Sequence, residues 1–178
     1  MINYVHLDET RSISLHSTVD EEVAEEVIEQ LYYLSESEGA IILSISTTGG
    51  CVFSGIAIAE TIFSISNKVI TIANGSAMSI GAFLVSCGTK GGRFTTNECK
   101  FMFHKPWSKE GGNLSEIEDE LFDYLRVNLN KPKWRLKWDF RKERAFTAQQ
   151  ALKYGFVDAI IHDGIKDKNR TQTFLTTP

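Results

Sequence analysis

Ser79 is the residue in this 178-residue chain whose setting first suggests chemistry. It lies in residues 75–81, which read GSAMSIG, between a predicted strand and a predicted apolar helix. Small residues let the backbone turn sharply there, as a nucleophile elbow requires, although Ala77 stands where the hydrolase elbow has glycine. The free N–H groups at the start of the helix would favour a developing oxyanion. A serine that merely caps a buried helix is the alternative.

Two further segments carry groups that would complete such a site. Residues 47–50 read TTGG after a predicted buried strand, and paired glycines expose backbone N–H groups that can receive an oxyanion. The alternative is an ordinary strand-to-helix turn. His104 ends the apolar run 101–103, and Pro106 holds the chain that follows, which suits an oriented base. For this residue the alternative is a packed or solvated histidine.

The elements that must position these residues alternate along the chain. Thr18 and Glu21 form a predicted capping box that opens a helix with an apolar stripe from Val23 to Leu34. Strands are then predicted at residues 40–46, 68–73, 100–104 and 156–161, and helices at 55–64, from Ser79, and from Thr147. Strands that alternate with helices predict parallel pairing and an α/β fold.

The pattern changes after Pro106. Residues 114–129 predict a long amphipathic helix, and Pro132 suits the first turn of another that carries Trp134 and Trp138 on one side. These large apolar side chains pack either within the monomer or against a second subunit. An acidic stretch at 116–120 and a basic stretch at 131–144 form either two solvated helix faces or a contact with a partner.

Composition bounds the class of protein. A length of 178 residues with 42% hydrophobic residues fits one domain with a sizeable core. The net charge of −4 and the isoelectric point near 5.6 give no reason to expect nucleic acid as a partner. No apolar run approaches the roughly 18 residues that span a membrane, and residues 1–11 lack a signal-peptide core. Cys51, Cys87 and Cys99 suggest reduced, packed thiols in the cytoplasm.

Five motifs occur in an order that resembles one protein family. They read TTGG at 47–50, AMSIG at 77–81, GTKGGRF at 88–94, MFHKP at 102–106 and FTAQQALKYGFVD at 146–158. Their order, together with the separation between Ser79 and His104, resembles the proteolytic subunit of the Clp protease. The resemblance runs from about Ser12 to Ile161.

The resemblance implies a fold and an assembly. The fold would be crotonase-like, a spiral of ββα units in one domain of residues 1–178. Residues 12–106 and 145–162 would form the head, about 107–144 a protruding helical handle, and 163–178 a tail. Family members self-associate into rings, usually two stacked heptamers with the serines facing an inner chamber. The implied partners are polypeptide substrates and an AAA+ unfoldase, with no nucleic acid, membrane, metal or organic cofactor.

The resemblance also assigns roles position by position. Ser79 would be the nucleophile and His104 the general base, with the backbone N–H groups of Gly50 and Ile80 forming the oxyanion hole. The family's third catalytic residue is an aspartate shortly before the helix start at Phe146, and that position here holds Glu143.

The third residue is where this sequence departs most from the family. A glutamate can orient a histidine, but its extra methylene requires a different backbone position. Asp139, one helical turn earlier, is the second candidate, whereas the aspartate that corresponds to Asp158 is not a triad member in the family. The segment between His104 and Glu143 is also shorter than the family's, and Thr48 replaces a proline.

The predicted function is a serine endopeptidase subunit of a self-compartmentalising barrel, which hydrolyses unfolded or short polypeptides through an acyl-enzyme. The chief alternative is a catalytically silent structural ring subunit that kept the fold. A specialised processing protease of a virus, an acyl-CoA enzyme of the same superfamily fold and a membrane-associated signal-peptide peptidase are further alternatives. The acyl-CoA enzyme would need a nucleotide pocket and carboxylates that the stretch beside Ser79 does not offer. The signal-peptide peptidase would pair serine with lysine.

Overall fold

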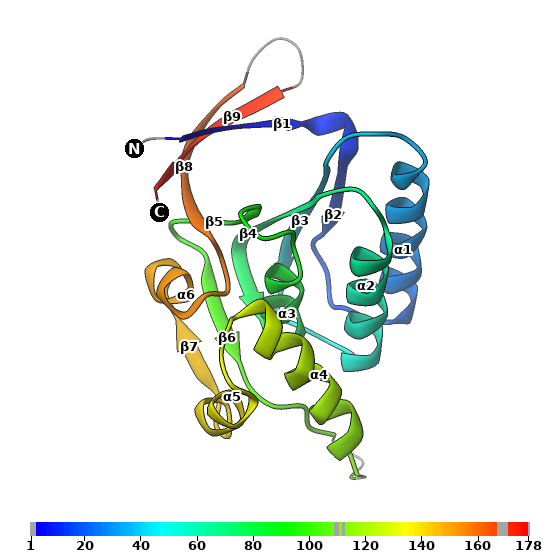
Figure 1. Ribbon diagram of the computed structural model, residues 1–178, viewed down its shortest axis with the longest axis vertical. Coiled ribbons are helices and arrows are strands. Elements are labelled where there is room, and N and C mark those ends of the chain that lie inside the picture. The colour runs from blue at the N-terminus through cyan, green and yellow to red at the C-terminus, as the bar shows by residue number, and fades with distance from the viewer. Residues whose placement is uncertain (1–2, 109–110, 112, 167–170, 178) are drawn as a thin grey trace.

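A mainly parallel sheet organises the chain. The computed structural model describes residues 3–108, 111, 113–166 and 171–177. The sheet follows the order β1-β9-β8-β5-β4-β3-β2, and β6 pairs with both β4 and β7. Neighbouring strands from β8 to β2 are parallel, as are β4 and β6. Helices separate these strands along the chain (Figure 1), so the predicted α/β fold is confirmed.

The helices and strands have the following bounds. The strands are β1 (Asn3–Asp8), β2 (Ser12–Leu15), β3 (Ile41–Thr47), β4 (Val69–Met78), β5 (Arg93–Thr96), β6 (Lys100–Phe103), β7 (Arg144–Phe146), β8 (Ala159–Lys166) and β9 (Thr171–Thr177). The helices are α1 (Glu21–Ser35), α2 (Val52–Ser64), α3 (Ile80–Ser86), α4 (Ser115–Asn128), α5 (Lys133–Asp139) and α6 (Ala148–Tyr154), with a short 3-10 helix at Glu9–Arg11.

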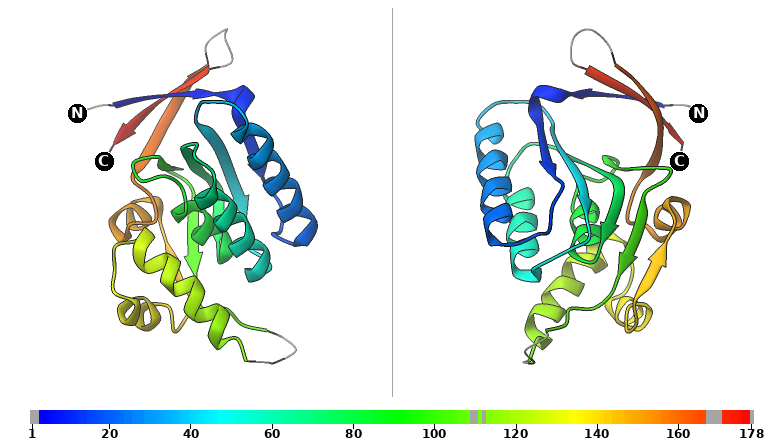
Figure 2. Two further views of the ribbon diagram at one scale, coloured as in Figure 1. Left: turned by 45° about the vertical axis from the view of Figure 1, so that its right-hand side comes forward. Right: turned by 180° about the vertical axis from the view of Figure 1, so that it is seen from behind.

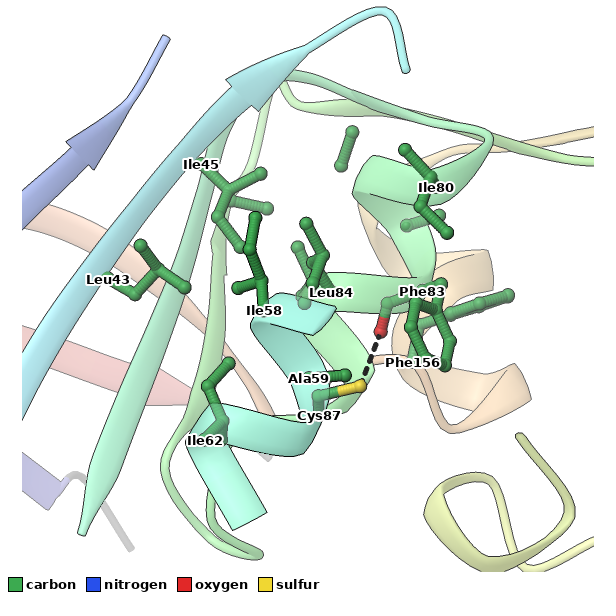
Figure 3. Packing of buried hydrophobic residues seen from close by; sticks show 14 of the residues in the cluster. Leu43, Ile45, Ile58, Ala59, Ile62, Ile80, Phe83, Leu84, Cys87 and Phe156 are labelled. Atoms are coloured by element: carbon green, nitrogen blue, oxygen red, sulfur yellow. Dashed lines mark hydrogen bonds between the residues drawn. The ribbon is translucent and has the colours of Figure 1, made fainter. Parts of the chain in front are cut away.

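The main core lies between the parallel strands and the helices on one face. Leu43 and Ile45 point from β3 toward Ile58 of α2 and Leu84 of α3, all of them buried (Figure 3). Helices α3 and α4 lie in front of the strands in Figure 1 and behind them in the rear view of Figure 2. Because side chains alternate along a strand, Ile42 of β3 points to the opposite face. There it joins a smaller cluster with Ile72, Phe94, Ala159 and Ile161.

Helix α1 begins two residues later than the predicted capping box. Asp20 is the N-cap, and its carboxylate accepts a hydrogen bond of 2.9 Å from the N–H of Val23. The predicted cap at Thr18 is therefore wrong, because the carboxylate of Asp20 reaches the N3 amide and satisfies the first turn. The last helix begins where predicted, and the structure adds a capping box there, since Thr147 and Gln150 cap α6 reciprocally.

The predicted handle is anchored on the main core. Helix α4 buries Leu121, Phe122 and Leu125, and α5 buries Leu136, all within the main cluster. Trp134 and Trp138 lie on the outer side of α5 and are exposed. Part of this segment's apolar surface therefore packs within the monomer, while the tryptophans stay open to another contact.

The acidic and basic stretches meet each other across α4 and α5. Lys133 pairs with Asp123 at 2.9 Å, and Lys137 pairs with Asp119 and Glu118. Hydrogen bonds and the lysine charges hold the pKa of Asp119 and of Asp123 below the usual value, although burial opposes this. Such solvent-exposed ion pairs contribute little to stability, because water and salt screen them. Within the described part of the chain, no helix combines the length and apolar character needed to cross a membrane.

Candidate active site

Two loops meet at the carboxyl ends of β3 and β4. The strands are parallel, and Thr47 pairs with Ala77 near their ends. The glycine pair that follows β3 therefore lies beside Ser79, which follows β4. A β-carbon built on Gly49 would lie 2.9 Å from the β-carbon of Ser79 and 3.1 Å from the carbonyl oxygen of Met78. The small residues thus let two backbones approach closely, as the sequence predicts.

Ser79 has the backbone of a strained turn. Its φ of 53° and ψ of −120° are rare for a residue with a side chain. A residue in such a conformation lowers the stability of the fold by about 1–3 kcal/mol, and residues of this kind are found mostly at functional sites. The N–H of Ser79 donates to the carbonyl of Met102 at 2.7 Å, which ties the turn to β6. Ser79 precedes α3, yet its side chain makes no capping hydrogen bond. The hydroxyl is therefore not consumed as a helix cap.

Two amides flank the serine. Gly50 lies in an isolated bridge with Val19, and a β-carbon there would overlap the Val19 backbone. Only glycine fits without displacing that chain. Ile80 begins α3, and the first amides of a helix have no intrahelical acceptor. Gly50 and Ile80 both line the cavity that contains Ser79.

His104 directly follows β6 and lines the same cavity as Ser79. This strand is parallel to β4, with Met78 opposite Met102, so Ser79 and His104 both leave the carboxyl end of the sheet. The ring is half-buried, and its Nδ1 lies 2.7 Å from the carbonyl oxygen of Lys105. A carbonyl can only accept a hydrogen bond, so Nδ1 carries the proton in this contact. In a neutral ring, Nε2 is then left with its lone pair.

The sequence-predicted residues Ser79, His104, Gly50 and Ile80 share one cavity of about 510 Å³. Most of its remaining wall is apolar. Those side chains come from α2, from β6 and the segment after it, and from α4 and its N-cap, and they are Val52, Phe53, Phe103, Pro106, Trp107, Leu114 and Leu121. A cavity with a few polar groups in an apolar wall is typical of a substrate site.

The two carboxylates predicted as third residue lie elsewhere. Glu143 is exposed and lines a separate groove with Met78 and Met102. Asp139 accepts hydrogen bonds from Arg135 at 3.0 Å and from the hydroxyl of Tyr154 at 2.8 Å. Burial would raise the pKa of Asp139, but these partners and the charge of Arg144 hold it below the usual value. The described contacts of His104 do not include either carboxylate.

The backbone nevertheless brings Glu143 near His104. Strands β6 and β7 are antiparallel, and Phe103 pairs with Arg144 at the last position of the ladder. One more pair in this register would set His104 opposite Glu143. The chain bends before that pair forms, and the N–H of Lys105 instead bonds to the carbonyl of Phe140 at 3.3 Å.

Asp158 forms a structural ion pair rather than a contact with His104. Its carboxylate binds the guanidinium of Arg93 through Nε at 2.8 Å and Nη2 at 2.5 Å, and it also accepts the N–H of Gly91 at 2.7 Å. Burial raises the pKa of Asp158, but the bonds and charge of Arg93 outweigh it and lower the pKa. Arg93 in turn donates to the carbonyl of Asn128, so the pair connects β5 and the start of β8 with α4.

One family model matches the sequence. Residues 2–164 match the model described as Clp protease, which is most of the chain. The chain belongs to the Clp protease family. The resemblance read from the five motifs is thereby confirmed at the level of the family, and the parallel sheet alternating with helices agrees with the fold that this family implies.

In this Clp protease family member, sequence reasoning missed one group in the cavity. Cys51 was expected to be a packed thiol, as Cys87 and Cys99 are, but it is exposed and lines the cavity beside Gly50. Burial would raise the pKa of the Cys51 thiol, yet hydrogen bonds from Ser54 and Phe53 lower it. Its place directly after the glycine pair was the signal that could have revealed it.

Proposed function

We propose that this chain is a serine endopeptidase subunit in which Ser79 is the nucleophile and His104 the general base. The observation that carries the proposal is the strained Ser79, with its hydroxyl free of any capping bond, in one cavity with His104. Membership of the Clp protease family supports the same assignment. The N–H groups of Gly50 and Ile80 are the proposed oxyanion hole.

The tautomer of His104 supports its role as base. With Nδ1–H donated to the Lys105 carbonyl, Nε2 is the nitrogen that can take a proton. Ser79 Oγ attacks the peptide carbonyl carbon while its proton passes to Nε2. The oxyanion that forms accepts hydrogen bonds from the two amides, each worth about 2.7–4 kcal/mol by comparison with other oxyanion holes.

Collapse of the tetrahedral intermediate completes the first half of the reaction. The C–N bond breaks, the leaving amine takes the proton from His104, and an ester of Ser79 remains. Water then attacks the ester and gives its proton to His104. The acyl–oxygen bond breaks, the serine regains its proton, and the carboxylic acid leaves.

Assembly into rings belongs to the same proposal. Family membership supports self-association into stacked seven-membered rings that enclose the serines, with an AAA+ unfoldase as an optional partner. Trp134 and Trp138 are exposed on one side of α5, where a second subunit could cover them. Native mass spectrometry of the purified chain measures the ring size directly. A chain that remains monomeric at micromolar concentration contradicts this part of the proposal.

A catalytically silent ring subunit is the second candidate. The observation in its favour is that the described contacts of His104 include no carboxylate. Retention of both Ser79 and His104 in one cavity favours the peptidase. The two candidates differ in a simple property, which is turnover of a polypeptide.

Cleavage of casein and of short fluorogenic peptides tests the proposal. We expect the wild-type chain to cleave both, and Ser79→Ala to lose about four to six orders of magnitude in kcat. Ser76→Ala is the matched control, because Ser76 lies near the end of β4, three residues before Ser79, and its hydroxyl bonds weakly to the Thr47 carbonyl. No turnover by an assembled wild-type chain favours the silent subunit.

A further inference from the structure

The contact between His104 and Lys105 has a consequence for the catalytic machinery. We propose that the main-chain carbonyl of Lys105, rather than a carboxylate, is the group that positions His104. This inference rests on the proposed function, because it names the third member of the same site. The carbonyl lies 2.7 Å from Nδ1, a short bond for a nitrogen donor and oxygen acceptor.

Among the residues that the structure describes, the nearby carboxylates have other partners or other locations. Asp139 is held by Arg135, Arg144 and Tyr154, and its side chain is 9% exposed. Asp158 is held by Arg93 at the opposite end of the parallel strands. Glu143 lies in the groove beside Met102 and is exposed to solvent. To reach His104, Asp139 would have to give up its ion pairs, and Glu143 would have to leave water.

The carbonyl of Lys105 is itself held in place. Pro106 follows Lys105, and a residue before proline is restricted to extended backbone, which fixes the direction of its carbonyl. On the other side, the N–H of Lys105 donates to the carbonyl of Phe140 at 3.3 Å. Phe140 is fully buried and packs edge-on against Phe103 with ring centroids 4.7 Å apart. The acceptor is therefore anchored to the core by two independent restraints.

A neutral carbonyl can do part of what a carboxylate does. It selects the tautomer with hydrogen on Nδ1 and fixes the plane of the ring, which leaves Nε2 directed at the proton to be removed. It carries no full charge, so it stabilises the imidazolium less than a carboxylate would. The rate should consequently be insensitive to the charge of Glu143 and sensitive to the restraint on Lys105.

Two variants test the positioning role. Glu143→Gln removes the carboxylate that the family pattern would use, and Glu98→Gln is its matched control, because Glu98 lines the same groove. We expect both to label with a fluorophosphonate within about twofold of the wild-type rate, whereas loss of a functional triad acid costs about 10⁴. Pro106→Ala relaxes the restraint on Lys105 and should slow kcat by about tenfold or more.

The tautomer gives a readout that does not depend on activity. Nitrogen-15 chemical shifts of the His104 ring should show hydrogen on Nδ1 in the wild type and in Glu143→Gln, and a mixture of tautomers in Pro106→Ala. A loss of about 10³–10⁴ in labelling by Glu143→Gln, with the fold retained, overturns the inference. Hydrogen on Nε2 in the wild type also overturns it. A wild type that does not label at all overturns the proposed function instead, since the ring shifts still report the tautomer.

Discussion

Ser79 combines a strained backbone with a side-chain hydroxyl that makes no capping hydrogen bond to α3. A serine that only capped α3 would bond its side chain to the helix amides, and this one makes no such bond. The left-handed φ of 53° is instead held by the bond from its N–H to Met102 and by the glycine beside it. A nucleophile elbow requires such strain, maintained by the surroundings, at a hydroxyl that lines a cavity, as the half-buried Ser79 does.

Cys51 should be the most reactive thiol of the chain. Hydrogen bonds from Ser54 lower its pKa although burial opposes them, whereas burial raises the pKa of Cys99 to about 11 and that of Cys87 further. A lower pKa gives more thiolate at neutral pH, and thiolate is the form that reacts. Iodoacetamide should therefore modify Cys51 first, as peptide mass spectrometry can show.

The same modification should block the cavity. Cys51 lines it together with Ser79, so a carboxamidomethyl group there should slow fluorophosphonate labelling of Ser79. Cys51→Ser should remove the effect of iodoacetamide and keep the labelling. Faster modification of Cys87 or Cys99 would contradict the assignment.

Helices α2 and α3 are in contact beside the candidate active site, where Gly55 of α2 packs against Ile80 of α3. A β-carbon on Gly55 of α2 would overlap the side chain of Ile80, the first residue of α3. We expect Gly55→Ala to lower the free energy of unfolding by about 1–3 kcal/mol, because overpacking displaces neighbours. It should also slow labelling of Ser79, since the Ile80 amide is a proposed oxyanion donor. Urea unfolding and the labelling rate measure the two effects, and a change in neither contradicts the account.

The strands that carry the site were predictable because their sequences are locally consistent. Apolar runs followed by small residues predicted β3 and β4, and the apolar run before His104 predicted β6. The pairing of β6 with the three-residue β7 was not predictable, because so short a strand is set by its partner. The location of Glu143 depends on that pairing and on the bend before it. Residue types alone therefore could not determine the group that faces His104.

For the molecule as a whole, the ion pair of Arg93 and Asp158 joins distant segments. It connects β5 with the start of β8 and, through Asn128, with α4; Arg93 is buried and Asp158 is half-buried. Asp158→Asn leaves the guanidinium without its charged partner. We expect this change to cost about 3–5 kcal/mol of unfolding free energy near pH 7.

The pH dependence of this loss has a definite sign. The folded pKa of Asp158 lies below its usual value of about 3.9, so the pair stabilises the fold above that pH. The contribution should disappear as the pH falls through the folded pKa. Urea unfolding of the wild type and of Asp158→Asn should thus converge at low pH. A constant difference from pH 7 to pH 3 would show that the loss comes from packing and not from charge.

Covalent labelling of Ser79 tests the central claim most directly. The assembled wild-type chain is treated with a fluorophosphonate, and the adduct is located by intact-mass and peptide mass spectrometry. The account predicts one adduct per chain, on Ser79, with none in Ser79→Ala and much slower labelling in His104→Ala. An assembled, folded wild type that takes no label, or that takes it on another residue, would contradict the assignment of Ser79 as the nucleophile.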